Sequence, residues 1–164
     1  MSRVASIAIQ KAVDILAAEE GLGPALERIA REEGETPPTL ESGQVMATAA
    51  SVELLEAQGR VRYPYLQVNC ERVINGMREK FRRFSGTVRI GVEARCSSER
   101  LASAEREARW LADALAEVLD HNRGDWGDGF YYGGGYEITF GATRTGGRNF
   151  VQTAKVAFEV SVAA

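Results

Sequence analysis

Histidine, cysteine and long apolar runs are scarce in this chain of 164 residues, and each scarcity excludes a class of function. His121 is the only histidine, so one chain cannot supply a histidine-based catalytic triad or a multi-histidine metal site. Cys70 and Cys96 are too few for the disulfide scaffold of a small secreted domain. Both lie on the apolar phase of predicted strands, and we interpret them as buried thiols; a disulfide between neighbouring strands is the alternative.

No apolar stretch approaches the ~20 consecutive residues that a membrane-spanning helix needs, so we expect no membrane partner. The residues from Met1 to Val4 lead directly into a helical pattern without a secretion signal, which predicts that the protein stays in the cytoplasm where it is made. A net charge of −3 is too small to imply long-range attraction to nucleic acid.

Size and composition indicate a single domain that spans residues 1–164. Apolar residues make up 45% of the chain and charged residues 26%, the mixture of an ordinary globular protein. At this length a hydrophobic core forms without metal or disulfide support.

The N-terminal third is predicted to combine helices with an irregular segment. Residues 2–19 and 24–33 carry apolar side chains at helical spacing. Residues 34–62 allow three interpretations: a long loop, a loose helix over residues 46–57, or an arm that only a partner orders. We treat residues 20–62 as an insertion or mobile arm within the domain.

Alternating polarity predicts four strands in the rest of the chain, and one long amphipathic helix separates the second strand from the third. Each strand is apolar on one face only, as in a half-buried antiparallel sheet. The helix begins at Ser97 or Ser98, either of which can cap it, and ends near Asn122. The strands lie within residues 66–70, 88–96, 136–142 and 156–162.

These elements predict an α+β fold with a mainly antiparallel four-stranded sheet. The long helix packs on one face of the sheet, and the extra N-terminal helices complete the domain. Because every strand has a single apolar face, we expect helices on that side only.

The register of the last hairpin follows from which residues share a face. A two-residue Gly146-Gly147 turn would place Ile138 opposite Lys155 and force the lysine into the core. Moving the pairing by one residue sets Ile138 opposite Val156. The loop must then contain an odd number of residues, three or five, with a glycine at positive φ.

Candidate catalytic and metal-binding groups are few. Asp125 and Asp128 lie in a turn-rich loop that lacks the regularly spaced oxygen ligands and late glutamate of a calcium site. Glu71 and Glu93 lie on the polar phase of their strands, where we expect solvent exposure and no shared burial to shift their pKa values. His121 is expected at a helix end, where its charge interacts with the helix dipole. We therefore predict no enzyme activity, no cofactor and no metal site.

One loop between the long helix and the third strand combines aromatic residues with glycines. Trp126, Phe130, Tyr131 and Tyr132 crowd this loop. Such aromatic side chains form a contact surface at an interface or fold back to cover the core, and both interpretations stay open.

Charge is distributed unevenly along the chain. Acidic residues predominate from residue 14 to 56, and basic residues predominate from 72 to 95. The basic run from Arg78 to Arg83 is able to meet phosphate, or it forms a solvated hairpin arm. A third interpretation is that the acidic face of one copy meets the basic face of the next, a head-to-tail contact that closes into a ring when the rotation permits.

Four segments follow one another in a recognisable order between Tyr63 and Val162. In the order and spacing of these segments, the chain resembles the tail terminator (tail completion, neck) proteins of tailed bacteriophages, with Glu20 to Gly59 as an insertion. The segments are the strands Tyr63-Pro64-Tyr65-Leu66-Gln67-Val68 and Ser85-Gly86-Thr87-Val88-Arg89-Ile90-Gly91-Val92, the helix Leu101 to His121 and the hairpin Tyr136 to Val162.

The resemblance implies a structural virion protein at the junction of tail and neck, made in the host cytoplasm. Proteins of this family form a hexameric ring on the end of the tail tube. The ring stops tube polymerisation and offers a surface to the head-neck connector or stopper proteins, while DNA passes through its lumen. The expected partners are therefore further copies of this chain, the tail tube protein and a head-neck protein.

Loops and hairpins provide the ring contacts in that family, which makes the last hairpin and the aromatic loop the expected contact sites. Two alternatives are another neck or minor tail component of a prophage and a nucleic-acid-binding module that uses Arg78 to Arg83. The residues expected to contact the ring or the tube are Arg144, Gly146, Gly147, Arg148, Trp126, Tyr131 and Tyr132.

Overall fold

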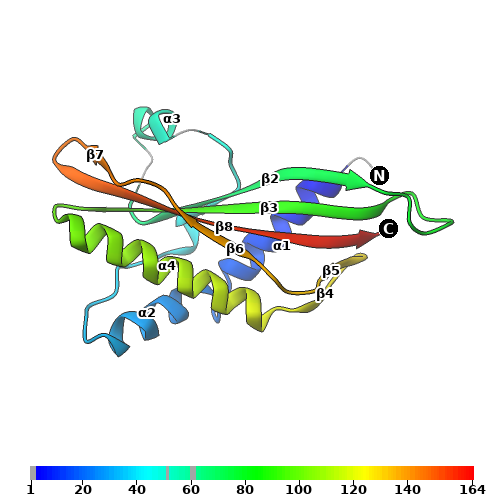
Figure 1. Ribbon diagram of the computed structural model, residues 1–164, viewed down its shortest axis with the longest axis horizontal. Helices are drawn as coiled ribbons and strands as arrows, with labels where there is room; N and C mark the ends of the chain where they lie inside the picture. The colour runs from blue at the N-terminus through cyan, green and yellow to red at the C-terminus, as the bar shows by residue number, and fades with distance from the viewer. Residues whose placement is uncertain (1–2, 51, 60–61) are drawn as a thin grey trace.

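The second predicted strand forms the centre of a curled mixed sheet in the computed structural model (Figure 1). β3 (Ser85–Ser98) lies between β2 (Tyr65–Asn75) and β8 (Asn149–Ala163), and both neighbours run antiparallel to it. The alternation along β3 is confirmed, because one face of the strand is fully buried at Val88, Ile90 and Val92. The structure describes residues 3–50, 52–59 and 62–164.

The sheet contains eight strands within the described residues, so the prediction of a four-stranded antiparallel sheet is wrong. β1 (Val45–Met46) pairs in parallel with β2, which makes the sheet mixed. The outer edge of β8 is shared by three short strands, since turns and glycines interrupt the chain that returns along it. These strands are β5 (Phe130–Tyr132), β6 (Glu137–Phe140) and β7 (Arg144–Gly146), and β4 (Gly124–Gly127) pairs with β5.

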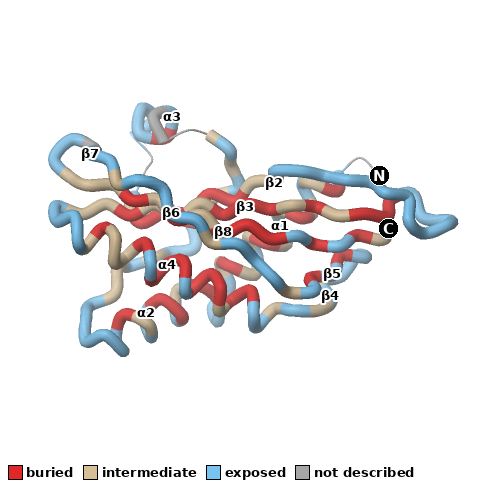
Figure 2. The backbone as a smooth tube through the Cα atoms, viewed as in Figure 1, coloured by how far each residue is buried: buried red, intermediate tan, exposed pale blue. Residues whose placement is uncertain are grey.

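Helices cover the apolar side of the sheet, as expected. α4 packs on β8 and β3, α1 packs mainly on β2, and α2 packs on α4 (Figure 1). The buried positions of α4 repeat along one stripe, and Figure 2 shows this stripe facing the sheet. No helix within the described part of the chain is long and apolar enough to span a membrane. The helices are α1 (Val4–Leu16), α2 (Leu22–Glu32), α3 (Val52–Ala57) and α4 (Leu101–His121), with a 3₁₀ turn, η1, at Ser42–Gln44.

The segment 20–62 contributes α2, η1, β1 and α3 to this domain. Leu22 and Leu26 of α2 are buried, and Arg28 Nη1 donates to Glu117 Oε1 of α4 at 2.7 Å. The predicted helix over residues 46–57 is correct only for its second half, because its first residue belongs to β1. Residues 1, 2, 51, 60 and 61 of the predicted elements lie outside the described residues.

The predicted cap of the long helix is wrong. Ser97 and Ser98 are the last residues of β3, and the helix begins after Arg100 without a side-chain cap. β3 is longer than its apolar alternation indicates because β8 pairs with it as far as Phe150. The predicted end of the helix is confirmed at Asn122, the residue that caps it.

The two cysteines are free thiols, as interpreted from the sequence. Cys96 is fully buried, and this burial raises the pKa of its thiol far above the ordinary value. Cys70 is only partly buried, and it pairs with Ile90, six residues away from Cys96 on β3.

The register predicted for the last hairpin is confirmed, but the predicted loop length is wrong. Ile138 pairs with Val156, yet Gly146 pairs with Asn149 across a turn of two residues. The register of β6 with β8 and the register of β7 with β8 differ by one residue. This slip in register therefore lies in the chain between β6 and β7. The side chain of Gln152 stabilises it: Nε2 donates to the Gly141 carbonyl at 2.7 Å, and Oε1 accepts from the Thr143 hydroxyl at 2.5 Å.

Gly86 sets how closely β2 and β3 approach next to the turn of their hairpin. It pairs with Asn75, and a Cβ at this position would overlap the carbonyl oxygen of Ile74. Backbone atoms cannot move aside without breaking the ladder, so only glycine fits here.

Replacing this glycine is expected to destabilise the protein. Gly86→Ala should lower the free energy of unfolding by about 1–3 kcal/mol, the usual cost of an overpacked site. The midpoint of urea unfolding measures the loss. Gly76→Ala is the control, because a Cβ there lies 3.4 Å from its nearest atoms, which belong to the flexible Arg78 side chain. Equal midpoints for the two variants would contradict the tight approach.

Candidate functional site

The β2–β3 hairpin projects beyond the helices at one end of the molecule, and residues 71–83 are exposed at every position. Figure 1 shows its turn at the right-hand end, past the C-terminus. Phe81 is fully exposed, at 102% of its reference area, and Met77 is 60% exposed. Val73 and Ile74, at the end of β2, are also exposed, so the end of β2 is uncovered on both faces, whereas Ser85 and Val88 of β3 are buried.

One asparagine organises the tip of this hairpin. The Asn75 side-chain oxygen accepts from the backbone N–H groups of Met77 and Ser85, each at 3.2 Å. Its Nδ2 atom donates to the carbonyl oxygen of Arg83 at 3.3 Å. Such local bonds let a turn replace the ladder hydrogen bonds. Met77 and Phe81 both have positive φ values, 47° and 69°, a conformation that non-glycine residues rarely adopt.

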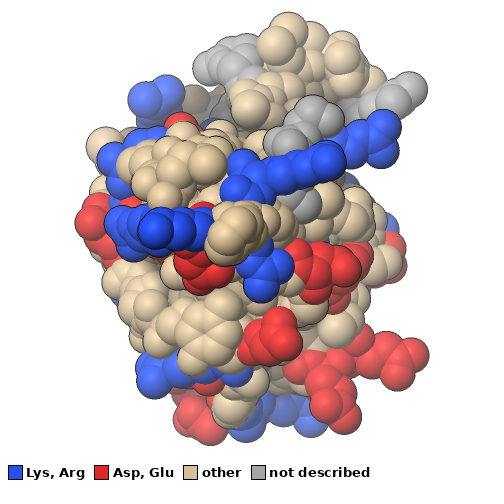
Figure 3. Space-filling view, turned by 90° about the vertical axis from the view of Figure 1, so that its right-hand side faces the viewer, with Lys and Arg blue, Asp and Glu red and all other residues tan. Residues whose placement is uncertain are grey.

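The same tip is strongly basic. The residues from 76 to 84 include four basic side chains and one acidic one. Glu79 lies 3.5 Å from Arg82, and no ion pair joins Arg78, Lys80 or Arg83 to another described residue. Figure 3, which views the molecule from this end, shows Lys and Arg side chains gathered across its upper half and most Asp and Glu side chains below them. We call residues 76–84 the distal tip.

The sheet face opposite the helices carries a ladder of ion pairs. Glu71 of β2 lies 3.1 Å from Arg89 of β3 and also pairs with Lys155 of β8, two strands away. Gly91 makes this reach across β3 possible, because a Cβ there would lie 2.6 Å from Glu71 Oε1. A second pair joins Arg72 to Glu159 at 2.9 Å on the same face.

These pairs refine the expectation that the sheet carboxylates are solvent-exposed. Glu71 is exposed as a residue, but its side chain alone is 23% exposed, and Glu93 is half-buried. Burial by itself would raise the pKa of Glu71, but its bonds to Lys155 and Arg89 outweigh burial and hold that pKa below the ordinary value. Glu93 pairs with Arg95 at 2.7 Å. Each carboxylate is thus held by a cation, an arrangement that favours its ionised form and a structural role.

The aromatic loop divides between core and surface. Tyr132 is fully buried with its hydroxyl donating to the Gly135 carbonyl at 3.0 Å, and its ring packs against Trp126 and Phe158. Trp126 is partly buried and donates its indole N–H to the Asn122 carbonyl at 2.8 Å. Of the three predicted contact residues in this loop, Tyr131 alone is exposed, at 53%. Trp126 and Tyr132 therefore cover the core.

The loop aspartates and the histidine have the structural roles expected of them. Asp125 accepts from the Gly127 N–H at 2.8 Å, a turn bond, and Asp128 lies 3.0 Å from Lys11. His121 is the exposed last residue of α4. Among the described residues, no group of three or more His, Cys, Asp or Glu side chains is placed to hold a metal ion.

The β7–β8 hairpin lies at the opposite end of the molecule from the distal tip (Figure 1). Arg144 and Arg148 are exposed on it, and neither forms an ion pair with another described residue. Gly146 pairs with Asn149, and Gly147 turns the chain at a φ of 67°. The predicted contact residues therefore do not form one site: the hairpin residues lie at one end and Tyr131 lies toward the other.

Sequence reasoning missed Phe81 and Met77 as candidate contact residues. The distal tip contains two phenylalanines three residues apart, and Phe84 is buried while Phe81 is exposed. The alternation of polar and apolar residues along a strand does not continue through a turn. The sequence pattern therefore does not show which of the two phenylalanines is buried. The signal that was available is the basic run, which indicates that the segment around Phe81 faces solvent.

No protein-family model matches the chain, and no curated protein matches it at a significant level.

The ion pairs of Glu71 predict a pH dependence of stability. Because its pKa is lower in the folded chain, its contribution is complete above the ordinary glutamate value of 4.5 and is lost as the pH falls through the folded value. Lys155→Met should reduce this loss of stability as the pH falls below 4.5, by no more than about 1 kcal/mol for a partly exposed pair. Urea unfolding at several pH values measures it. Lys80→Met is the control, and an equal slope in both variants would contradict the assignment.

Proposed function

We propose that this chain is a structural subunit that assembles into a ring, similar to the tail terminator proteins of tailed bacteriophages. In this role the ring, expected to be a hexamer, caps the tail tube in the virion and joins it to the head-neck protein. DNA passes through the lumen, and the subunit needs no catalytic residue and no cofactor. The proposal combines the resemblance in element order with the exposed hairpins.

The observation that carries the proposal is the distal tip. Burial of a phenylalanine side chain stabilises a folded protein by roughly 1.5–3 kcal/mol. Phe81 is fully exposed, so the isolated chain does not gain this stabilisation. The tip is nevertheless held in a defined shape by Asn75. An ordered arm that presents an apolar residue among cations is suited to contact another protein.

The two hairpins lie at opposite ends of one sheet. This arrangement favours a role in assembly rather than a protein with a single binding site. A subunit that caps a tube must contact its ring neighbours and also the tube, and these contacts need different surfaces. The β3–β8 pairing connects the ends rigidly, because it continues from Ser85 to Ser98 without interruption.

Reversing the charge of the β7–β8 hairpin is expected to impair assembly and leave the monomer folded. Arg144→Glu with Arg148→Glu should weaken ring formation or tube capping by about tenfold, equivalent to about 1.4 kcal/mol. The reason is that the new carboxylates would face the partner groups that suit the two arginines. Native mass spectrometry and electron microscopy of capped tubes measure the two effects.

The matched control for this test carries the same change of charge elsewhere. Arg100→Glu with Arg109→Glu alters exposed positions at and within α4. Unchanged capping by the hairpin variant, or equal loss in both variants, would count against a contact role for the hairpin.

Nucleic-acid binding is the second candidate, favoured by the basic side chains of the distal tip that have no ion-pair partner among the described residues. Duplex DNA binding followed by fluorescence anisotropy tests it. Contacts to phosphate by Arg78, Lys80 and Arg83 would give a slope of about −3 in log K against log salt concentration. A ring interface with an apolar centre is expected to be far less sensitive to salt. A steep slope that Lys80→Ala reduces by about one would favour the nucleic-acid function.

A further inference from the structure

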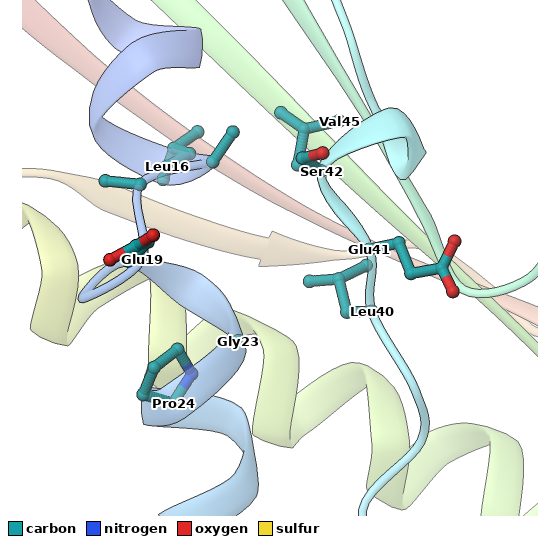
Figure 4. A pocket seen from close by; sticks show the side chains of 10 residues that line it. Leu16, Glu19, Gly23, Pro24, Leu40, Glu41, Ser42 and Val45 are labelled. Atoms are coloured by element: carbon teal, nitrogen blue, oxygen red, sulfur yellow. The ribbon is translucent and has the colours of Figure 1, made fainter.

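A pocket of about 200 Å³ lies where α1 ends, α2 begins and the chain approaches β1. Figure 4 shows Leu16 and Val45 at its inner side and Leu40 and Pro24 beside it, with Glu19 at the edge. Leu16 and Val45 are buried members of the core, so they give the pocket an apolar base. We call this space the α1–α2 pocket.

Close backbone packing and a buried hydrogen bond hold the segments that line the α1–α2 pocket. Gly21 connects the two helices, and a Cβ at this position would lie 2.6 Å from the Leu16 carbonyl oxygen and 2.8 Å from that of Ile15. On the other side, η1 is held by Gln44, whose Nε2 atom donates to the Pro64 carbonyl at 2.6 Å. A pocket held in this way can accept a ligand without first being ordered, which lowers the cost of binding.

The volume of this pocket suits one aromatic side chain, and its lining combines an apolar base with the polar residues Glu19, Glu41 and Ser42. A cavity of about 150 Å³ lined by apolar side chains is known to bind benzene, so the volume here is sufficient for a phenyl ring. Polar atoms at the opening, including the Glu19 carboxylate, would remain accessible to groups that flank the ring.

The surroundings of the pocket are acidic. Residues 19–41 contain seven acidic side chains and two basic ones. Both basic side chains already have partners, since Arg28 pairs with Glu117 and Arg31 pairs with Glu27. Glu41 lies 3.4 Å from Arg62, and no ion pair joins Glu19 to another described residue.

The distal tip has the complementary chemistry. Phe81 is a fully exposed phenyl ring, and Lys80 and Arg82 flank it directly in the chain. We propose that Phe81 of one copy of this chain occupies the α1–α2 pocket of the next copy, with Lys80 facing Glu19. This inference rests on the proposed function and names the contact that joins neighbouring subunits.

The position of the two surfaces makes this contact an intermolecular one. The distal tip lies at the right-hand end of the molecule in Figure 1, whereas α2 lies in the left half. Tip and pocket are different surfaces, so repetition of the contact generates a closed ring or a filament, and a reciprocal contact generates a dimer.

Removal of the phenyl ring tests the contact in the full-length chain. Phe81→Ala should raise the dissociation constant of the oligomer by at least about 30-fold, the effect of losing a central interface residue. Because Phe81 makes no buried contact within the chain, the variant should fold normally, which circular dichroism checks. Phe140→Ala is the matched control, because Phe140 is 51% exposed on β6. Native mass spectrometry and sedimentation velocity measure the oligomers.

Exchange of charges tests the orientation of the contact. Lys80→Glu and Glu19→Lys should each weaken the oligomer, and the double variant should recover most of the loss because opposite charges meet again. General loss of stability or solubility would not produce such recovery.

The outcomes separate this inference from the proposed function. A wild-type ring that Phe81→Ala leaves intact, or a double variant without recovery, overturns the docking contact and leaves ring assembly in place. A dimer that Phe81→Ala abolishes supports the docking contact and overturns the ring. A wild-type chain that stays monomeric both at high concentration and on tail tubes overturns both.

Discussion

The pairing of β3 with β8 is the constraint on which the rest of the structure depends. It continues from Ser85 opposite Ala163 to Ser98 opposite Phe150 without a bulge. Two long strands in one register present a continuous apolar face, and α4 and α1 bury it. β2, β5, β6 and β7 pair directly with this central pair, β1 and β4 join the sheet through β2 and β5, and the ion pairs on the opposite face keep that side polar.

This arrangement explains why the hairpins are exposed. The β2–β3 ladder extends to Asn75 and Gly86, and residues 76–83 beyond it are exposed, whereas Phe84 at the end of the distal tip is buried in the core. Local hydrogen bonds from Asn75 then replace tertiary packing. The apolar side chains that remain exposed there are the strongest reason to expect a protein partner, because water is a poor environment for them.

The acidic α1–α2 side and the basic distal tip give the molecule two surfaces of different chemistry. The sequence already indicates this asymmetry, and the head-to-tail interpretation follows from it. What the fold adds is an apolar component on both surfaces, a pocket based on Leu16 and Val45 and a free phenyl ring at Phe81. Charge then favours approach and orientation, while the apolar contact provides most of the affinity.

The sequence by itself determined the α+β class, the long helix, the buried face of β3 and the register of Ile138 with Val156, because periodicity and burial act between near neighbours and opposed pairs. It did not determine the short strands along β8, the slip supported by Gln152, or the division of the aromatic loop into buried Tyr132 and exposed Tyr131. Those features depend on which distant backbone edge remains free and on which side chain fills the space beside it. Only the tertiary structure decides such contacts, and the same reason separates Phe81 from Phe84 in the distal tip.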